Sequence, residues 1–216
     1  MIFNGDKKVG QSILHIPEKK FVDAYTPKIP RFIETYHLTY MTILWSGLIV
    51  LFGYLAQENF QWLWGMSVCI FMQWLTDAFD GAVGRLRNTG LIKWGYYMDH
   101  FLDYIFLCSI IIAYSFIIPN EYKHLVFFIF AIVGAFIVNS YLSFAATNEF
   151  RVSYLGVGPT EARIVFIIIN TLLIIFGKTY MAWSIPLITM GGMIGLIFVV
   201  HQTQKYIWNI DMKNKK

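Results

Sequence analysis

Charged residues are scarce in this chain of 216 residues: Asp, Glu, Lys and Arg make up 14% of it, where a soluble protein has about a quarter. Hydrophobic residues make up 57% and are concentrated in repeated apolar runs. A soluble globular domain is therefore excluded, and the composition predicts an integral membrane protein. The two cysteines, Cys69 and Cys108, both lie inside apolar runs, which excludes a disulfide framework and a cysteine-based zinc site.

The basic N-terminal stretch lacks the uninterrupted apolar core of a secretory signal. We expect residues 1–37 to form an amphipathic segment on the membrane surface, in which Pro17, Pro27 and Pro30 prevent one continuous helix. Six apolar windows follow, and about 20 residues suffice to cross a hydrocarbon core about 30 Å thick. The predicted spans lie near 38–56, 61–80, 96–118, 124–147, 162–177 and 181–204. The predicted fold is an all-α membrane protein with six transmembrane helices in 38–204 and a basic tail at 205–216.

The distribution of basic residues predicts the orientation of these spans. Of the 17 Lys and Arg residues, all but Lys123 and Lys178 fall in the N-terminal segment, the tail or the loops on one side. Short loops rich in Lys and Arg stay in the cytoplasm, so we expect both termini there. A basic face beside anionic headgroups explains the net charge of +4, and no nucleic-acid partner is needed.

Four aspartates lie at the ends of two predicted spans, with Asp77 and Asp80 closing the second and Asp99 and Asp103 opening the third. An aspartate at the centre of a membrane helix costs roughly 2.5–3.5 kcal/mol, so four together imply a compensating partner. The i, i+3 and i, i+4 spacings place each pair on one helix face. We expect no basic side chain on these faces except His100, which points elsewhere. The pattern predicts one or two divalent cations, and ligation by oxygen alone favours Mg²⁺, Mn²⁺ or Ca²⁺.

Glycines and arginines fill the segment that we expect to connect these two spans: Gly81, Gly84, Gly90, Gly95, Arg85 and Arg87. Glycine lets a bulky ligand approach the backbone, and arginine offers paired donors suited to phosphate. Alternatively the glycines serve close helix packing or a turn and the arginines only fix orientation; we prefer this for Gly90 and Arg87. Together with the carboxylates, the segment predicts a pyrophosphate site.

The stretch Asp77-x2-Asp80-Gly81-x2-Gly84-Arg85-x9-Gly95-x3-Asp99-x3-Asp103 resembles the signature of the CDP-alcohol phosphotransferases, membrane enzymes of phospholipid headgroup synthesis. Its eight fixed positions fall within 27 residues. The family usually has alanine at the position of Gly84, and we expect the loss of one methyl group to be tolerated. The chain is also similar to the family in its six-helix plan, its cytoplasmic site and its length.

This resemblance implies roles for individual residues. The implied ligands of a divalent metal, Mg²⁺ or Mn²⁺, are Asp77, Asp80, Asp99 and Asp103. Asp103 would also serve as general base. The residues implied to contact the CDP portion are Asp77, Gly81, Gly84 and Arg85. Thr39 stands where relatives often have a threonine that faces the nucleotide, and relatives are commonly homodimers. The alternative, that the aspartates are helix caps and loop carboxylates, does not explain Asp103, which lies a full turn further into the span.

A second polar cluster straddles the expected loop between spans four and five, on the same membrane side as the aspartates. We regard Tyr141, Glu161 and Arg163 as candidates for the acceptor pocket. The alternative is an ordinary loop in which Thr160 caps the fifth span, with Glu161 and Arg163 in its first turn. Family members with phosphorylated acceptors usually carry arginines where this chain has residues 143–146, Ser-Phe-Ala-Ala. Their absence favours an acceptor without a phosphate.

With this resemblance, the sequence predicts a metal-dependent transferase that moves a substituted phosphate from a CDP-linked donor to an alcohol and releases CMP. The donor is CDP-diacylglycerol with a small polar alcohol as acceptor, or CDP-choline or CDP-ethanolamine with diacylglycerol as acceptor. A relative that binds CDP-lipid without turnover is one alternative. An ion-coupled transporter is disfavoured, because spans one, five and six carry almost no ionisable groups and the aspartates crowd the cytoplasmic end.

Overall fold

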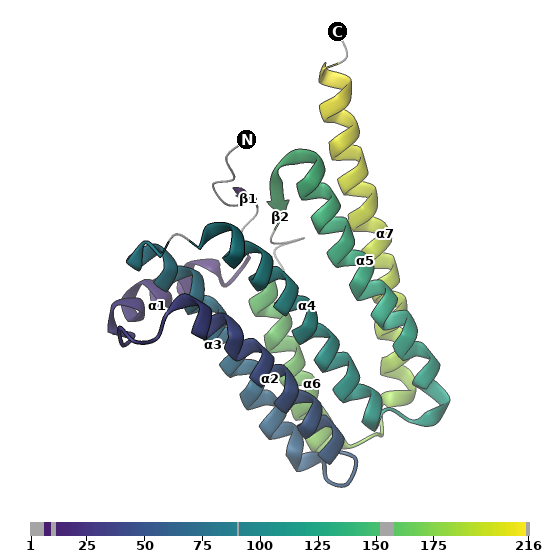
Figure 1. Cartoon of the computed structure of the whole chain (residues 1–216). Coiled ribbons are helices and arrows are strands. Elements are labelled where there is room, and N and C mark those ends of the chain that lie inside the picture. Colours follow the sequence, from purple (N-terminus) through teal and green to yellow (C-terminus); the bar gives the residue numbers. More distant parts are fainter. Residues whose placement is uncertain (1–6, 10–11, 90, 152–157, 215–216) are drawn as a thin grey trace.

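The computed structural model describes residues 7–9, 12–89, 91–151 and 158–214. These residues form helices joined by short connections, together with one pair of three-residue strands (Figure 1). The helices are α1 His15–Tyr25, α2 Thr35–Leu55, α3 Leu63–Arg87, α4 Ile92–Ile117, α5 Lys123–Thr147, α6 Pro159–Phe176 and α7 Met181–Asn214, with 3-10 turns at Thr26–Lys28, Phe60–Trp62 and Asn120–Tyr122. Strands β1 (Lys7–Val9) and β2 (Glu149–Arg151) pair in parallel. The prediction of an all-α membrane protein is confirmed.

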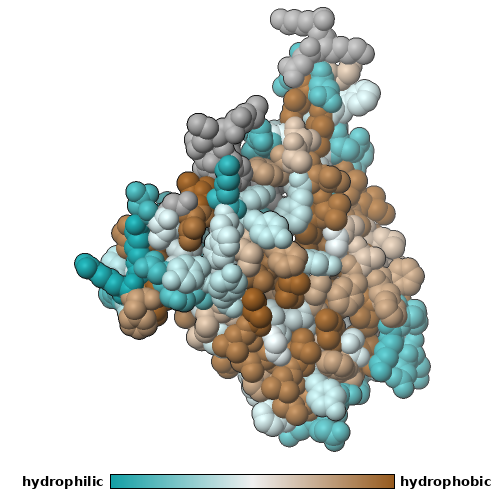
Figure 2. All heavy atoms as spheres, in the orientation of Figure 1, coloured by the Kyte–Doolittle hydropathy of each residue, from teal (hydrophilic) through white to brown (hydrophobic). Residues whose placement is uncertain are grey.

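Five helices have the length and composition of membrane spans: α2, α4, α5, α6 and α7. Apolar side chains cover the flank of the helices, while hydrophilic residues gather towards the ends (Figure 2). Helix α3 has 25 residues, which is also long enough, but it carries Gln73, Asp77 and Asp80 among its apolar residues. It packs against α2 and α6. The sixth span therefore stays a prediction, and α3 is the helix to which it refers.

The predicted segment between the second and third spans is much shorter than expected. Helix α3 runs to Arg87 and α4 begins at Ile92, so only residues 88–91 connect them. The glycines of this segment lie inside helices, Gly81 and Gly84 in α3 and Gly95 in α4, and Gly90 lies outside the described residues.

Packing explains this extension of α3. Phe79 and Ala82 are buried with Val22 of α1 in a small apolar cluster, and this burial offsets the poor helix propensity of glycine. The helix ends at Asn88, whose φ of 51° is left-handed and typical of a residue that terminates a helix.

The N-terminal segment contains the predicted break. Pro17 lies in the first turn of α1, where proline is tolerated, and the break falls at Pro27 and Pro30, before α2. Arg87 holds this connection in place. Its guanidinium donates to the carbonyl oxygens of Ile29, Pro30, Arg31 and Ile33, and it lies 3.6 Å from a carboxylate oxygen of Glu34. Arg87 is thus a structural residue, a role that the sequence analysis did not foresee when it assigned Arg87 to orientation alone.

Helix α7 is longer than the span predicted for it. Its 34 residues correspond to about 51 Å, well beyond a hydrocarbon core of about 30 Å. Residues 205–214 therefore continue α7 and do not form a separate tail. Figure 1 shows the C-terminal end of α7 extending past the other helices.

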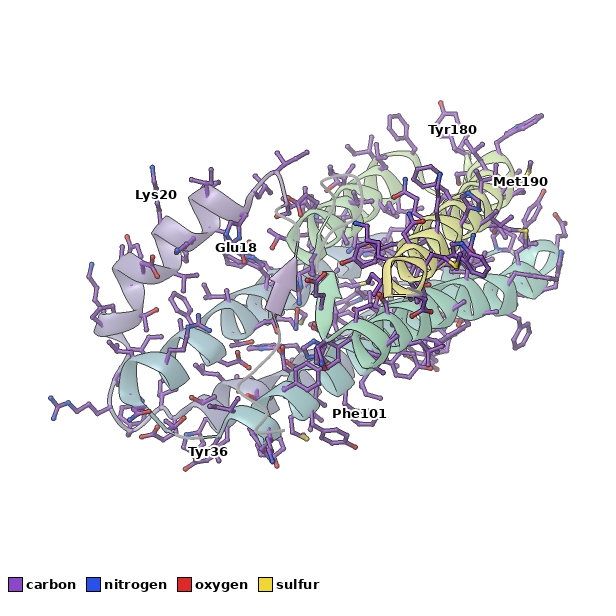
Figure 3. All side chains as sticks on the ribbon, turned by 90° about the horizontal axis from the view of Figure 1, so that it is seen from above. Glu18, Lys20, Tyr36, Phe101, Tyr180 and Met190 are labelled. Carbon is purple, nitrogen blue, oxygen red and sulfur yellow. The ribbon has the colours of Figure 1, made fainter. Side chains whose placement is uncertain are left out.

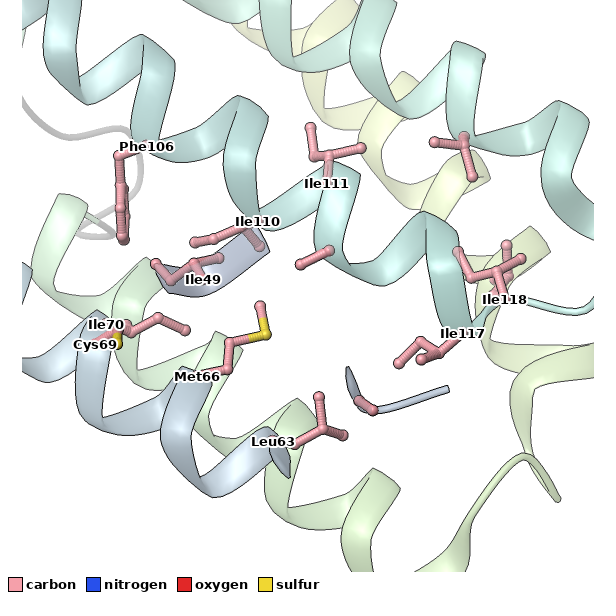
Figure 4. Packing of buried hydrophobic residues seen from close by; sticks show 14 of the residues in the cluster. Ile49, Leu63, Met66, Cys69, Ile70, Phe106, Ile110, Ile111, Ile117 and Ile118 are labelled. Atoms are coloured by element: carbon pink, nitrogen blue, oxygen red, sulfur yellow. The ribbon is translucent and has the colours of Figure 1, made fainter. Parts of the chain in front are cut away.

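An apolar core lies between α2, α3 and α4, with Ile49, Met66, Ile70 and Ile110 fully buried at its centre (Figure 4). Gly53 of α2 permits the close approach of α4, because a Cβ atom there would lie 2.6 Å from the Cα atom of Ala113. Small residues at such crossings let membrane helices pack closely.

Gly53→Ala is expected to destabilise the protein by about 1–3 kcal/mol, because the added methyl group forces α2 and α4 apart. Thermal unfolding in detergent measures the effect. Gly47→Ala in the same helix is the matched control, since no described atom beyond its own stretch of helix lies within 4 Å of a Cβ at Gly47. Equal melting temperatures for the two variants would contradict the proposed packing role of Gly53.

The connections alternate between two ends of the molecule. Residues 56–62, 118–122 and 177–180 lie at one end, opposite α1, the end of α3, the start of α4 and the C-terminal end of α7 (Figure 1). If the basic residues set the orientation, a cysteine replacing exposed Leu91 is labelled only from the cytoplasm, and one replacing exposed Gln57 only from the other side. Impermeant maleimide on intact cells tests this, with Cys69 and Cys108 replaced first. Labelling of both positions from one side would overturn the orientation.

Candidate active site

Three of the four aspartates meet between α3 and α4. Asp77, Asp99 and Asp103 each offer a carboxylate oxygen, and these three oxygens lie within 4.8 Å of one another. All three residues are half-buried. The helical spacing explains the arrangement, because Asp99 and Asp103 lie one turn apart on α4 and face Asp77 across the helix pair. An all-oxygen donor set of this size fits a hard divalent cation such as Mg²⁺ or Mn²⁺.

Asp80 stands apart from this group of three. Its side chain is buried, and its Oδ2 accepts a hydrogen bond of 3.0 Å from the Thr39 hydroxyl of α2. The same hydroxyl lies 3.1 Å from the backbone carbonyl oxygen of Thr35. Thr39 therefore fixes the orientation of Asp80 at the edge of the carboxylate cluster.

The aspartates have a basic partner that the sequence analysis did not foresee, because it considered only the helix faces that carry them. Arg163 reaches over from α6, and its Nη2 lies 2.9 Å from Oδ2 of Asp77 and 3.2 Å from Oδ1 of Asp103. His100 also differs from the expectation, since its Nδ1 lies 3.5 Å from Oδ2 of Asp99. The cluster thus carries positive charge from a helix that is distant in the sequence.

Gln73 completes the surroundings of Arg163. Its Oε1 accepts a hydrogen bond of 2.7 Å from Nε of Arg163, and both side chains are buried, with 0% and 5% exposure. The sequence analysis did not single out Gln73. A signal was present: a polar residue in an apolar span needs a partner, and Gln73 precedes Asp77 by one helical turn.

The predicted nucleotide contacts lie beside the cluster at the end of α3. Arg85 is exposed, and its guanidinium makes no ion pair or hydrogen bond with any residue that the structure describes. A Cβ atom on Gly81 would lie 3.3 Å from Nη1 of Arg85, and one on Gly84 would lie 3.0 Å from the Thr35 hydroxyl. The space that alanine would need at position 84 is therefore partly filled by Thr35.

The three candidates for an acceptor pocket make different contacts in the structure. The Tyr141 hydroxyl donates to the backbone carbonyl of His100 at 2.9 Å, next to the aspartates of α4. Glu161 accepts from the backbone N–H groups of Leu14 at 2.8 Å and Gly158 at 2.9 Å. The bond from Gly158 makes Glu161 part of the cap of α6, and the bond from Leu14 joins Glu161 to the start of α1. Of the three, Arg163 is the one that contacts the aspartates directly.

Helix α1 is fastened to the start of α6. Thr160 does not cap α6, which begins after Gly158; its hydroxyl donates to a carboxylate oxygen of Glu18 at 2.8 Å. Glu18 lies on the side of α1 towards α6, whereas Lys20 points away from the helices (Figure 3). The N-terminal segment thus forms part of the structure around the site.

A groove of about 310 Å³ opens beside Arg163, with walls from α1, α3 and α6. Its lining is mostly apolar: Leu14, Pro17, Phe21, Phe71, Trp74, Ile164 and Ile167, with Glu18, Thr160 and Arg163 as the polar members. This mostly apolar groove therefore reaches Arg163, which contacts Asp77 and Asp103.

These features define a membrane protein of several apolar helices with a carboxylate cluster suited to a divalent cation at one end. The chain matches the CDP-alcohol phosphatidyltransferase family over residues 35–200, and it belongs to this family. The family is one of phosphotransferases that depend on a divalent metal and act in phospholipid synthesis. A search of curated proteins found no match.

Proposed function

We propose that this chain transfers a substituted phosphate group from a CDP-linked donor to an alcohol and releases CMP. The observation that carries the proposal is the group formed by Asp77, Asp99 and Asp103, whose oxygens lie within 4.8 Å of one another inside the segment that matches the family. The two donor arrangements, with CDP-diacylglycerol or with CDP-choline or CDP-ethanolamine, share the same bond chemistry and both remain open.

The proposed metal ligands are Asp77, Asp80, Asp99 and Asp103. A bound Mg²⁺ or Mn²⁺ would stabilise negative charge on the pyrophosphate oxygens of the donor. Asp80 is held by Thr39 at the edge of the cluster, so its carboxylate is positioned before any ligand binds. Pre-positioned donors of this kind need little reorganisation during the reaction.

We assign the roles of the other site residues from where they lie relative to the carboxylate cluster. Asp103 takes the proton from the attacking hydroxyl group. Gly81 and Gly84 contact the CDP portion along the backbone of α3, and the exposed guanidinium of Arg85 pairs with its phosphates. Tyr141, which contacts the backbone of α4 near Asp103, lies on the acceptor side.

The groove beside Arg163 suits the apolar part of a lipid substrate. Its walls come from both the surface helix α1 and the spans, so a lipid could enter it from the bilayer. Residues 143–146 of α5 carry no basic side chain, which favours an acceptor without a phosphate. We further propose that the site faces the cytoplasm, with both termini on that side.

A CMP-release assay tests the proposal. Purified protein with Mg²⁺ is given each CDP donor in turn, crossed with a panel of alcohols that includes diacylglycerol. The expected result is metal-dependent CMP release that needs one donor and one acceptor together. Binding of a CDP donor without CMP release under any pairing would instead identify a non-catalytic relative.

A further inference from the structure

Arg163 is held from three sides although it belongs to none of the helices that carry the aspartates. Gln73 accepts from its Nε, and its Nη2 lies within 3.2 Å of both Asp77 and Asp103. The residue is 5% exposed. A guanidinium this deeply buried stays charged and needs its carboxylate partners, because an unpaired buried charge is strongly unfavourable.

Two of these partners belong to the group that could bind a metal. The group consists of Asp77, Asp99 and Asp103, and Arg163 contacts the first and the last of them. A divalent cation bound there would meet a positive charge already in place, and two cations that share the same carboxylates repel each other strongly in a partly buried site.

The Gln73 side chain adds an independent observation. It is fully buried, and its Nε2 has no hydrogen-bond acceptor among the residues that the structure describes. A buried donor without an acceptor is unfavourable and calls for an explanation. The surroundings of Arg163 therefore contain one buried donor that no described acceptor satisfies.

We propose that Arg163 is a built-in counter-cation that competes with the divalent metal for Asp77 and Asp103. Metal binding displaces its Nη2 from the carboxylates, while the bond from Nε to Gln73 keeps the guanidinium close by. The displaced guanidinium then faces the phosphate groups of the CDP donor, for which its planar donors are suited. This inference rests on the proposed function, which supplies the metal and the phosphates.

A structural role makes the opposite prediction. If Arg163 only orients the two aspartates for the metal, its removal loosens the ligands and weakens metal binding. If it competes with the metal, its removal strengthens metal binding. The sign of the change in metal affinity therefore separates the two roles, and no turnover is needed to measure it.

The experiment is a Mn²⁺ titration of the purified protein without nucleotide, followed by the electron paramagnetic resonance signal of free Mn²⁺. Arg163→Met should bind Mn²⁺ roughly tenfold more tightly than the wild type. Arg163→Gln should shift the Mn²⁺ affinity in the same direction. This variant replaces Arg163→Met if the methionine variant does not fold, because its amide can still hydrogen-bond to Gln73. Lys93→Gln is the charge-matched control, because Lys93 is exposed at the start of α4, and its affinity should stay unchanged.

The outcomes are distinct. Unchanged or weaker Mn²⁺ binding in the folded Arg163 variants would overturn the competition. Equal tightening in Lys93→Gln would also overturn it, since the effect would then be one of overall charge. A folded wild-type protein that binds no Mn²⁺ would refute the metal site of the proposed function itself.

Discussion

CMP release is expected to stop in excess EDTA and to fall at least about 10³-fold in Asp77→Asn, because several kcal/mol of charge stabilisation by the metal are lost. Asp77 is one of the three aspartates whose oxygens lie within 4.8 Å of one another, so metal-dependent binding of the CDP donor should be lost together with turnover. CMP release and calorimetric titration of the donor, each with and without Mg²⁺, measure both effects.

The control for this variant is Asp23→Asn, which removes the same charge from an exposed position on α1 and should leave CMP release unchanged. The folded state of Asp77→Asn is checked by its melting temperature, since the change also removes one partner of Arg163. Full CMP release in EDTA would exclude a metal-dependent reaction. Wild-type donor binding by folded Asp77→Asn would remove Asp77 from the metal site.

Asp103→Asn is expected to lower kcat by roughly 10²–10⁴-fold, the usual loss for a general base, while much of the affinity for the CDP donor is preserved. Asp99→Asn should instead weaken metal and donor binding first. Each change removes one carboxylate from the same cluster, so a role of charge alone would make the two variants indistinguishable.

Calorimetric titration of the CDP donor and single-turnover CMP release, both with each variant, separate binding from chemistry. Equal losses of donor affinity in Asp99→Asn and Asp103→Asn would refute the division of labour. Asp103 would then serve as a metal ligand only, and the base would have to be sought elsewhere.

Local sequence patterns predicted most of the helices closely but missed how far α3 and α7 extend. An apolar run long enough to cross a bilayer can be recognised from the local sequence alone. The expected spans accordingly agree closely with α2, α4, α5 and α6. The extension of α3 through Gly81 and Gly84 was missed, because it depends on Ala82 packing against Val22 of α1. A contact between residues 60 positions apart in the sequence leaves no trace in local periodicity.

The same limit applies to the site. Spacing alone brought Asp99 and Asp103 onto one face of α4, and Asp77 was expected to face them, as it does. The charge of Arg163 was not expected there, because α6 meets α3 only after the chain has crossed the bundle several times. Thr39 was noted by its likeness to relatives, but its bond to Asp80 depends on the packing of α2 against α3.

The fastening of α1 to α6 has a practical consequence for handling this protein. The backbone of Leu14 and the carboxylate of Glu18 hold the first turn of α6, the turn that precedes Arg163. Deleting the first 18 residues would strip these bonds from the helix that carries Arg163. Affinity tags and surface attachment for binding studies therefore belong after α7, whose end points away from the other helices (Figure 1).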